Sequence, residues 1–198
     1  MTRVKICGLT NAEDAWAAAA LGADALGFIA VPESPRFVSP ETVRQVVRGL
    51  PPFLTTVVVA RQPIDSSEYP CEVVQFYGGD EQTTAMRRLR VFRVKDELSL
   101  LELRDYHRTA DAFLLDTFHE SALGGVGKTF DWSLALEAKR IAGDIPILLA
   151  GGLTPDNVAE AVRTVRPYAV DVSSGVEAEP GRKDHEKLRR FLDAVRSA

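Results

Sequence analysis

The sequence predicts an α/β fold, and within that class a single (β/α)8 TIM barrel of near-minimal size. Short apolar runs alternate with longer, polar-interrupted segments along the whole chain, a pattern typical of strands followed by helices. Eight such apolar runs can be counted. Because each pairing of parallel strands needs a crossover, strict alternation implies a parallel sheet, and eight units suggest closure into a barrel. An open, doubly wound sheet is the competing architecture.

The eight apolar runs define the expected strands, and the first of them shows which side chains should face inward. Alternate residues of a strand point to opposite sides, so Val4 and Ile6 share one face, and Lys5 and Cys7 share the other. The apolar pair should face the surrounding helices, which turns Lys5 and Cys7 into the barrel. In chain order, the expected strands are Val4–Cys7, Ala25–Ile29, Leu54–Ala60, Val73–Phe76, Val91–Val94, Ala112–Leu115, Pro146–Ala150 and Ala169–Val172.

Local signals mark the first two helices. Asn11 can cap a helix that Gly22 ends. Ser39 is a typical N-cap, and Pro40 occupies the first helical position of a segment that runs to about Gly49. Each of these helices follows an expected strand, as the barrel requires.

The connection between the third and fourth strands breaks this rhythm. Arg61–Pro70 contains both Pro63 and Pro70, so the helix after the third strand should be very short or missing. The rhythm then resumes. The later helices are expected near Glu81–Leu89, near Glu97–Arg108, and at Asp131–Ile141, Pro155–Val165 and Asp184–Val195.

Length and composition indicate a single catalytic domain, residues 1–198. The formal net charge is −4, which gives no sign of a nucleic-acid partner. The apolar runs are too short to span a membrane, and the N-terminus lacks the apolar stretch of a signal peptide. Two cysteines do not resemble a disulfide-rich secreted scaffold. We therefore expect a cytoplasmic protein with a small-molecule substrate, no membrane partner, and a monomeric or homodimeric state.

In barrels of this kind the active site lies at the carboxyl ends of the strands. Cys7 ends the first strand beside Lys5, and a nearby ammonium would favour its thiolate. Asp116 follows the apolar run Phe113–Leu115, where partial desolvation would raise its pKa and keep it able to donate a proton. A buried, inert thiol and a helix-capping carboxylate are the alternative interpretations.

Glycines and serines after the last two strands suggest an anion site. Glycine lets a backbone approach an anion closely, and backbone N–H groups at helix N-termini bind phosphate. A tight turn alone would also explain the first pair, but two adjacent loops favour phosphate binding. The expected phosphate-binding residues are Gly151, Gly152, Ser173, Ser174 and Gly175.

Arg36 lies in the loop after the second expected strand. Its planar guanidinium is suited to binding a carboxylate of the substrate.

No metal or nucleotide motif is visible. The three histidines, His107, His119 and His185, lack ligand spacing, and Gly125-Val126-Gly127 alone is too weak to indicate a nucleotide site. We expect no cofactor and no metal.

Six segments, running in order from one end of the chain to the other, resemble the phosphoribosylanthranilate isomerase family. Each is unspecific alone, but together they are specific. They are Val4–Thr10 (VKICGLT), Ser34–Arg36 (SPR), Leu114–Thr117 (LLDT), Gly124–Trp132 (GGVGKTFDW), Ala150–Leu153 with Pro155 and Asn157, and Asp171–Glu177 (DVSSGVE).

The resemblance implies a cofactor-free Amadori rearrangement in tryptophan biosynthesis. It would convert N-(5-phosphoribosyl)anthranilate into 1-(2-carboxyphenylamino)-1-deoxyribulose 5-phosphate. By the same resemblance Cys7 is the general base at ribose C2, Asp116 is the general acid at the ring oxygen, and Arg36 holds the anthranilate carboxylate. Gly125 and Gly127 join the phosphate-loop residues as expected substrate contacts.

The chain departs from the family pattern in two places. Family members commonly have a histidine after the fourth strand, where this chain has Gln75-Phe76-Tyr77-Gly78. An aromatic stretch often found after Gly27-Phe28 is here Ile29-Ala30-Val31. Both departures concern contact with the anthranilate and closure of the loops.

Three other functions are weighed against this one. The related isomerase of the imidazole pathway has aspartate where this chain has Cys7, and its substrate carries two phosphates. Indole-glycerol-phosphate synthase relies on lysine and glutamate residues that have no clear match here. A non-catalytic barrel that binds a phosphometabolite would need neither Cys7 nor Asp116.

Overall fold

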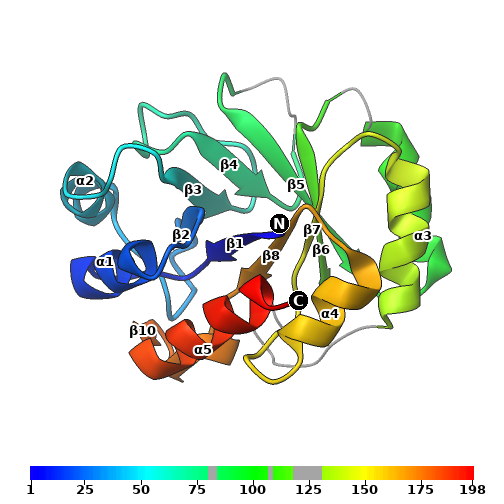
Figure 1. The fold of residues 1–198 in the computed structure, drawn as a ribbon. Coiled ribbons are helices and arrows are strands. Elements are labelled where there is room, and N and C mark those ends of the chain that lie inside the picture. Colours follow the sequence, from blue (N-terminus) through cyan, green and yellow to red (C-terminus); the bar gives the residue numbers. More distant parts are fainter. Residues whose placement is uncertain (80–83, 107–108, 118–130) are drawn as a thin grey trace.

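The computed structural model describes residues 1–79, 84–106, 109–117 and 131–198, and it contains a closed barrel of eight strands. The strands pair in parallel in chain order, and β8 closes the barrel by pairing with β1, with Arg3 opposite Ala169 and Ile6 opposite Val172. Figure 1 shows the helices arranged around the outside of the strands. The predicted TIM barrel is confirmed, and an open doubly wound sheet is excluded.

The strands lie close to their predicted positions. The barrel is formed by β1 (Arg3–Ile6), β2 (Ala25–Ile29), β3 (Thr55–Ala60), β4 (Val73–Phe76), β5 (Arg87–Val94), β6 (Ala112–Thr117), β7 (Ile147–Leu149) and β8 (Ala169–Val172). The α-helices of the described residues are α1 (Ala12–Ala20), α2 (Pro40–Arg48), α3 (Trp132–Ala142), α4 (Val158–Val165) and α5 (His185–Arg196).

The predicted caps explain where the first helices begin. The Asn11 side chain accepts a hydrogen bond from the Asp14 backbone N–H at 2.8 Å, and the Ser39 hydroxyl accepts one from the Thr42 N–H at 3.2 Å. Each satisfies a donor that the first helical turn leaves unpaired.

The segment between β4 and β5 differs from its prediction. The helix expected near Glu81–Leu89 is wrong for the part that the structure describes, because Thr84–Met86 are not helical and Arg87 already begins β5. From Arg87 onward the chain pairs with β4, with Val73 opposite Arg87. The arginine-rich pattern is compatible with a polar helix surface, but pairing with β4 makes this segment a strand.

Two other connections follow or modify the prediction. No helix lies between β3 and β4. The residues that connect these strands form turns, bends and irregular backbone, as the prolines predicted. After β5, the expected helix is a 3-10 helix, η2 (Glu97–Tyr106), and residues 107 and 108 of the prediction lie outside the described residues.

The core has two parts, as a closed barrel requires. Val4 and Ile6 belong to the large cluster between the barrel and its helices. A smaller cluster includes Leu89, Val91 and Leu114 and fills the inside of the barrel. Lys5 and Cys7 are buried on the opposite side of β1 from the apolar pair, so their predicted inward orientation is confirmed.

A small extension follows β8. After β8 come a short 3-10 helix, η3 (Ser174–Val176), and a hairpin of β9 (Glu177–Glu179) and β10 (Arg182–Lys183). α5 follows and packs beside α1 and α4.

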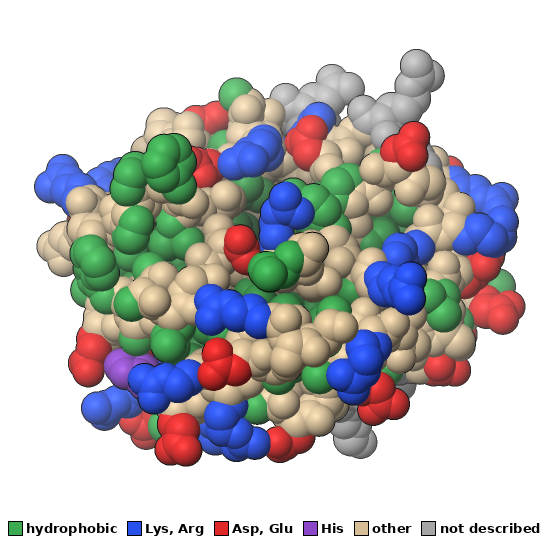
Figure 2. Space-filling view, viewed as in Figure 1, with side chains coloured by type: hydrophobic (Ala, Val, Ile, Leu, Met, Phe, Trp, Pro, Cys, Tyr) green, Lys and Arg blue, Asp and Glu red, His purple; other side chains and the backbone are tan. Residues whose placement is uncertain are grey.

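The surface shows no extended block of one charge on the face drawn in Figure 2, where Lys and Arg side chains alternate with Asp and Glu. Among the described residues, no helix has the length and apolar character needed to cross a membrane.

Candidate active site

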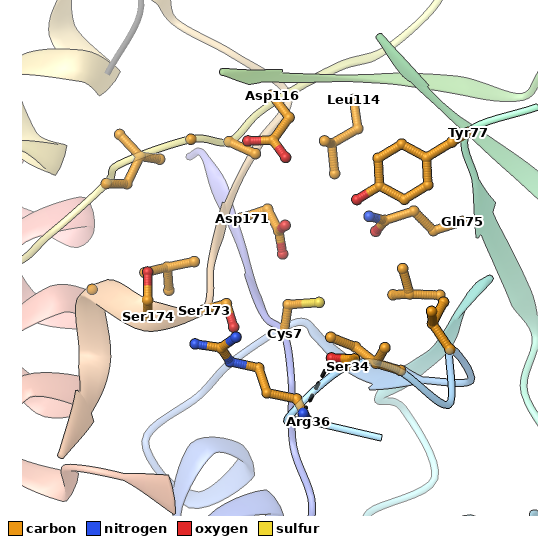
Figure 3. Close-up of a pocket in the computed structure, with 18 of the residues that line it drawn as sticks. Cys7, Ser34, Arg36, Gln75, Tyr77, Leu114, Asp116, Asp171, Ser173 and Ser174 are labelled. Carbon is orange, nitrogen blue, oxygen red and sulfur yellow. Dashed lines mark hydrogen bonds between the residues drawn. The ribbon is translucent and has the colours of Figure 1, made fainter. Parts of the chain in front are cut away.

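A cavity of about 770 Å³ opens at the carboxyl ends of the barrel strands. Residues of β2, β3, β4, β5, β6 and β8 contribute to its wall, together with Cys7 directly after β1 and with loops that follow the strands. The site therefore lies where barrel enzymes carry out their chemistry. Figure 3 shows the arrangement of its polar groups. The polar residues that line it include Cys7, Arg36, Tyr77, Asp116, Asp171 and Ser174.

Lys5 and Cys7 emerge from β1 toward the cavity, where Lys5 is held by a buried ion pair. Its ammonium lies 2.8 Å from a carboxylate oxygen of Asp171 on β8. Burial disfavours the Lys5 ammonium, but Asp171 and Cys7 together outweigh burial, and the pKa of Lys5 is raised. Lys5 therefore carries its charge in the barrel interior.

The Cys7 thiol is buried, and burial raises its pKa. The Lys5 ammonium acts in the opposite direction but does not prevail, partly because Asp171 also disfavours a second negative charge. The expectation that Lys5 favours the thiolate of Cys7 enough to keep it ionised is therefore wrong. The ammonium is already paired with a carboxylate, so its effect on the thiol is reduced.

Gly27 on β2 leaves room for this pair. A Cβ atom at Gly27 would lie 2.9 Å from the Cys7 sulfur, closer than real Cβ contacts, and a tight 3.2 Å from the Lys5 ammonium nitrogen. A larger residue here would therefore displace these groups from their positions.

Asp116 lies near the end of β6, facing the same cavity. Burial, and then the charge of Asp171, raise the pKa of Asp116 to about 6. One of its carboxylate oxygens accepts a hydrogen bond from the Thr117 backbone N–H at 2.8 Å, which opposes the shift without cancelling it. Burial at the end of an apolar strand thus raises the pKa of Asp116, as expected from the sequence.

Asp171 occupies the space between the two candidate catalytic groups. In Figure 3 its carboxyl lies between Asp116 and Cys7, and its charge raises the pKa of both. The sequence carried a signal for it, because Asp171 interrupts the apolar strand Ala169–Val172 at a position that alternates with Val170 and Val172.

The opposite wall is formed by β4 and β5. The side chains of Gln75 and Tyr77 point into the cavity (Figure 3), and the Arg93 guanidinium lies 5.0 Å from the centre of the Tyr77 ring. Burial raises the pKa of the Tyr77 hydroxyl, so it stays protonated. The position where the family commonly has histidine thus carries a neutral hydrogen-bonding group.

Arg36 lies at the edge of the cavity in the loop after β2. Its Nε and Nη2 atoms donate to the two carboxylate oxygens of Glu177, at 2.8 and 2.6 Å. Gly8 makes this possible, because a Cβ there would lie 2.6 Å from the Arg36 Cδ, and Gly8 has a positive φ of 72°. Two of the Arg36 nitrogens expected to bind a substrate carboxylate, Nε and Nη2, therefore bind Glu177 instead.

The two loops after β7 and β8 meet beside the cavity. Gly151 and Gly152 have φ values of 84° and 65°, in the left-handed region that glycine tolerates. Asn157 braces the first loop, donating to the Gly152 carbonyl at 3.0 Å and accepting from the Thr154 N–H at 2.8 Å. Together with the Ser173–Gly175 loop, these glycines line the cavity.

The structure thus brings most of the predicted site residues into one cavity. Cys7, Arg36 and Asp116 line it together with the predicted phosphate-loop residues Gly151, Gly152, Ser173, Ser174 and Gly175. The predicted contacts Gly125 and Gly127 lie outside the described residues. Cys71 is buried in the outer core cluster, where burial raises its pKa to about 12.

Sequence reasoning assigned no role to Arg93, Glu177 or Lys183. Arg93 lay in the predicted strand Val91–Val94, and the alternation of side chains along β5 could have placed it in the barrel. Glu177 and Lys183 meet through the hairpin of β9 and β10, and no spacing in the sequence announces that contact. Among the described residues, no group of three His, Cys, Asp or Glu side chains is arranged to hold a metal ion.

Comparison with known proteins extends this picture to the whole chain. A family model described as N-(5'phosphoribosyl)anthranilate (PRA) isomerase matches residues 4–194. The chain is 50% identical to N-(5'-phosphoribosyl)anthranilate isomerase of Geobacter sulfurreducens, with 97% of each chain covered.

Solved structures give the same result. The crystal structure of phosphoribosyl anthranilate isomerase from Thermotoga maritima superposes with a TM-score of 0.88 at 37% identity, covering 100% of both chains. Another structure of this enzyme, in complex with reduced 1-(o-carboxyphenylamino)-1-deoxyribulose 5-phosphate, gives a TM-score of 0.84 at 36% identity and the same coverage. The closed barrel, its polar cavity and these full-length matches together establish that this chain belongs to the phosphoribosylanthranilate isomerase family.

Proposed function

We propose that residues 1–198 form one catalytic domain that isomerises N-(5'-phosphoribosyl)anthranilate to 1-(2-carboxyphenylamino)-1-deoxyribulose 5-phosphate, a step of tryptophan biosynthesis. The observation that carries the proposal is the pairing of a thiol and a carboxyl of raised pKa in one cavity, between a guanidinium and two glycine- and serine-rich loops. The names of the full-length relatives supply the substrate.

Asp116 acts first, as the general acid. Its protonated carboxyl gives a proton to the furanose ring oxygen while the bond from that oxygen to C1 breaks. The lone pair of the anthranilate nitrogen stabilises C1 as an iminium ion, and the sugar opens. A pKa of about 6 suits this role, because a carboxyl of ordinary pKa would hold almost no proton at neutral pH.

Cys7 acts second, as the general base. Its thiolate removes the proton from C2, and the electron pair of that C–H bond forms a C1–C2 double bond and neutralises the iminium nitrogen. The resulting enol becomes the ketone as a proton is delivered to C1 and the C2 hydroxyl loses its proton to solvent. The iminium cation helps this step, because its positive charge favours the thiolate that burial disfavours.

The two anionic ends of the substrate hold the ribose between these groups. The phosphate binds the loops containing Gly152, Ser173 and Ser174, and the anthranilate carboxylate binds the part of the Arg36 fork that Glu177 leaves open. Fixing both ends brings C2 and the ring oxygen to the reacting side chains. Acid–base catalysis suffices for this isomerisation, so we propose a cofactor-free reaction.

The test is turnover of freshly generated phosphoribosylanthranilate by the purified protein, followed as loss of its fluorescence. Cys7→Ser and Asp116→Asn should keep the fold but lose most of kcat, because a serine alkoxide is inaccessible near neutral pH and an amide is a poor proton donor. With deuterium at ribose C2, Cys7→Ser should show a primary isotope effect. An effect confined to Asp116→Asn would mean that the two roles are reversed.

A cytoplasmic location and a monomeric or homodimeric state stay predictions. Light scattering coupled to size-exclusion chromatography measures the second directly.

A further inference from the structure

Glu177 is a buried carboxylate that contacts two cations. It begins β9, and it is only 7% exposed. Besides its two bonds to Arg36, one of its oxygens accepts a hydrogen bond from the Lys183 ammonium at 2.9 Å. Despite burial, Arg36 and Lys183 lower the pKa of Glu177, so it is ionised across the neutral range.

Lys183 connects Glu177 to the loop after β8. Its side chain is fully buried, and its ammonium also donates to the Ser173 carbonyl oxygen at 3.2 Å. Burial lowers the pKa of Lys183, and the Glu177 carboxylate opposes this shift. Glu177 therefore holds Arg36 at the end of the cavity that is proposed to bind the substrate carboxylate. Through Lys183 it also holds the Ser173 backbone at the end that is proposed to bind the phosphate.

The hairpin is tied to the rest of the barrel and gives this cluster a fixed position. Lys183 pairs with Glu177 across β9 and β10, and the Lys183 backbone N–H donates to Asp14 on α1 at 2.8 Å. The Thr10 hydroxyl donates to the Gly181 carbonyl. The turn and the second strand of the hairpin are thereby anchored to the segment that follows Cys7.

We propose that Glu177 is a positioning residue that sets the distance and orientation between the two anion-binding ends of the site. The proposal rests on the proposed function, because it takes the loops after β7 and β8 and Arg36 as the phosphate and carboxylate subsites. Glu177 lies behind Arg36 rather than on the cavity wall, so it acts through Arg36 and Lys183 and does not touch the reacting atoms.

The charge balance supports this role. Arg36 and Lys183 contribute two positive charges, and Glu177 contributes one negative charge, so the cluster keeps one net positive charge for an anionic substrate. A guanidinium bound through two parallel hydrogen bonds has its plane fixed before substrate arrives. Such preorganisation strengthens binding of the substrate without altering proton transfer.

Glu177→Gln tests the proposal against a matched control. The control is Glu179→Gln, two residues along the same hairpin, whose exposed carboxylate lies 4.0 Å from exposed Arg182. We expect Glu177→Gln to raise KM by about tenfold or more and to leave kcat within about threefold, because ordering of a binding group is lost and the acid and base remain. Glu179→Gln should match the wild type in both.

Two partial ligands separate the two ends of the site. Ribose 5-phosphate carries the phosphate alone and anthranilate carries the carboxylate alone, and calorimetry gives the Kd of each without any turnover. Glu177→Gln should weaken both, whereas Lys183→Met should weaken mainly ribose 5-phosphate, because Lys183 contacts the Ser173 carbonyl. If Glu177→Gln binds both ligands as Glu179→Gln does, the positioning role is wrong.

Glu177→Gln leaves a buried ammonium without its carboxylate, which can unfold a protein. The double variant Glu177→Gln with Lys183→Met removes that unpaired charge. It should melt closer to the wild type than Glu177→Gln does and should still show raised KM. A return to wild-type KM in the double variant would overturn the proposal. A wild type that binds both partial ligands but does not turn over the substrate would instead contradict the proposed function, with the Kd values still deciding the role of Glu177.

Discussion

At the scale of single residues, the cavity combines two groups whose protonation preferences oppose their proposed roles. The proposed acid, Asp116, has a pKa of about 6, and the proposed base, Cys7, has a pKa above the ordinary thiol value of 9.0. At neutral pH most molecules of the free enzyme hold an ionised carboxylate and a neutral thiol. The reactive form instead has a protonated Asp116 and a Cys7 thiolate. It is a minor fraction of the enzyme, and this fraction stays nearly constant between the two pKa values.

This arrangement predicts the pH dependence of kcat/KM. Below about pH 6 the carboxyl is already protonated and only the thiolate fraction changes, so the logarithm of kcat/KM should rise with pH. Between about 6 and the thiol pKa, gain of thiolate and loss of protonated Asp116 cancel, so the profile should be flat. Stopped assays in buffers of constant ionic strength would measure it.

Asp116→Asn provides the control for that assignment. Without the carboxyl titration, the residual kcat/KM of the variant should keep rising through pH 6 to 9 rather than levelling. A plateau beginning near pH 6 in the variant would show that another group causes the break.

The same carboxyl predicts a pH-dependent stability. The folded state raises the pKa of Asp116 from 3.8 to about 6, so the fold favours its neutral form, and that stabilisation is lost as pH rises through 6. The shift corresponds to roughly 3 kcal/mol. We expect the wild type to lose about this much stability between pH 4 and 7.5 relative to Asp116→Asn, measured by urea unfolding of both at each pH. Parallel pH profiles for the two proteins would contradict it.

At the scale of elements, the site depends on how closely the loops after β7 and β8 approach. A Cβ at Gly175 would lie 1.9 Å from the Leu153 carbonyl oxygen, which is backbone and cannot rotate away. Gly175 is thus the point at which η3 contacts the loop after β7, and Ser174 and Gly152 on either side of this contact both line the cavity.

Gly175→Ala should therefore separate the two loops. We expect KM to rise by about tenfold or more, with a smaller change in kcat, because the phosphate site is disturbed while Cys7 and Asp116 stay on their strands. Gly78→Ala is the control, since a Cβ there meets nothing within 4 Å. Equal KM values for the two folded variants would show that the close contact is irrelevant to binding.

At the scale of the whole molecule, the closed barrel separates stability from chemistry. The layer between strands and helices is apolar, and it includes an edge-to-face contact between Phe92 and Phe113 with ring centres 5.0 Å apart. The carboxyl end of the barrel interior instead holds Lys5, Asp116 and Asp171. Burying such charged groups costs stability, which the surrounding layer has to supply.

Removal of one side chain from that layer should be costly. Phe113 is fully buried, so Phe113→Ala should lower the free energy of unfolding by about 3–5 kcal/mol. Phe53→Ala removes the same atoms from a fully exposed position and should change stability by no more than about 0.5 kcal/mol. Chemical denaturation of both variants is the measurement, and similar losses in the two would contradict the assignment of the core.

Much of the fold could be predicted from short-range pattern alone. The apolar runs located the barrel strands to within a few residues, except for β5, and Asn11 and Ser39 marked the first helix starts. For β5 the prediction found only Val91–Val94, because the arginine-rich first half becomes a strand through its pairing with β4. Residues that follow strands directly, such as Cys7 and Asp116, were found for the same reason, since all parallel strands end at one face.

The sequence by itself determined the class of fold, the face on which the site lies and the side chains that end on that face. These follow from alternation and from neighbours in the chain. Only the tertiary structure decided the charges of the site: the pairing of Lys5 with Asp171, the raised pKa of Cys7, and the cluster of Arg36, Glu177 and Lys183. A pKa and an ion pair depend on burial and on distances between residues far apart in the chain, and barrel closure and the final hairpin set both.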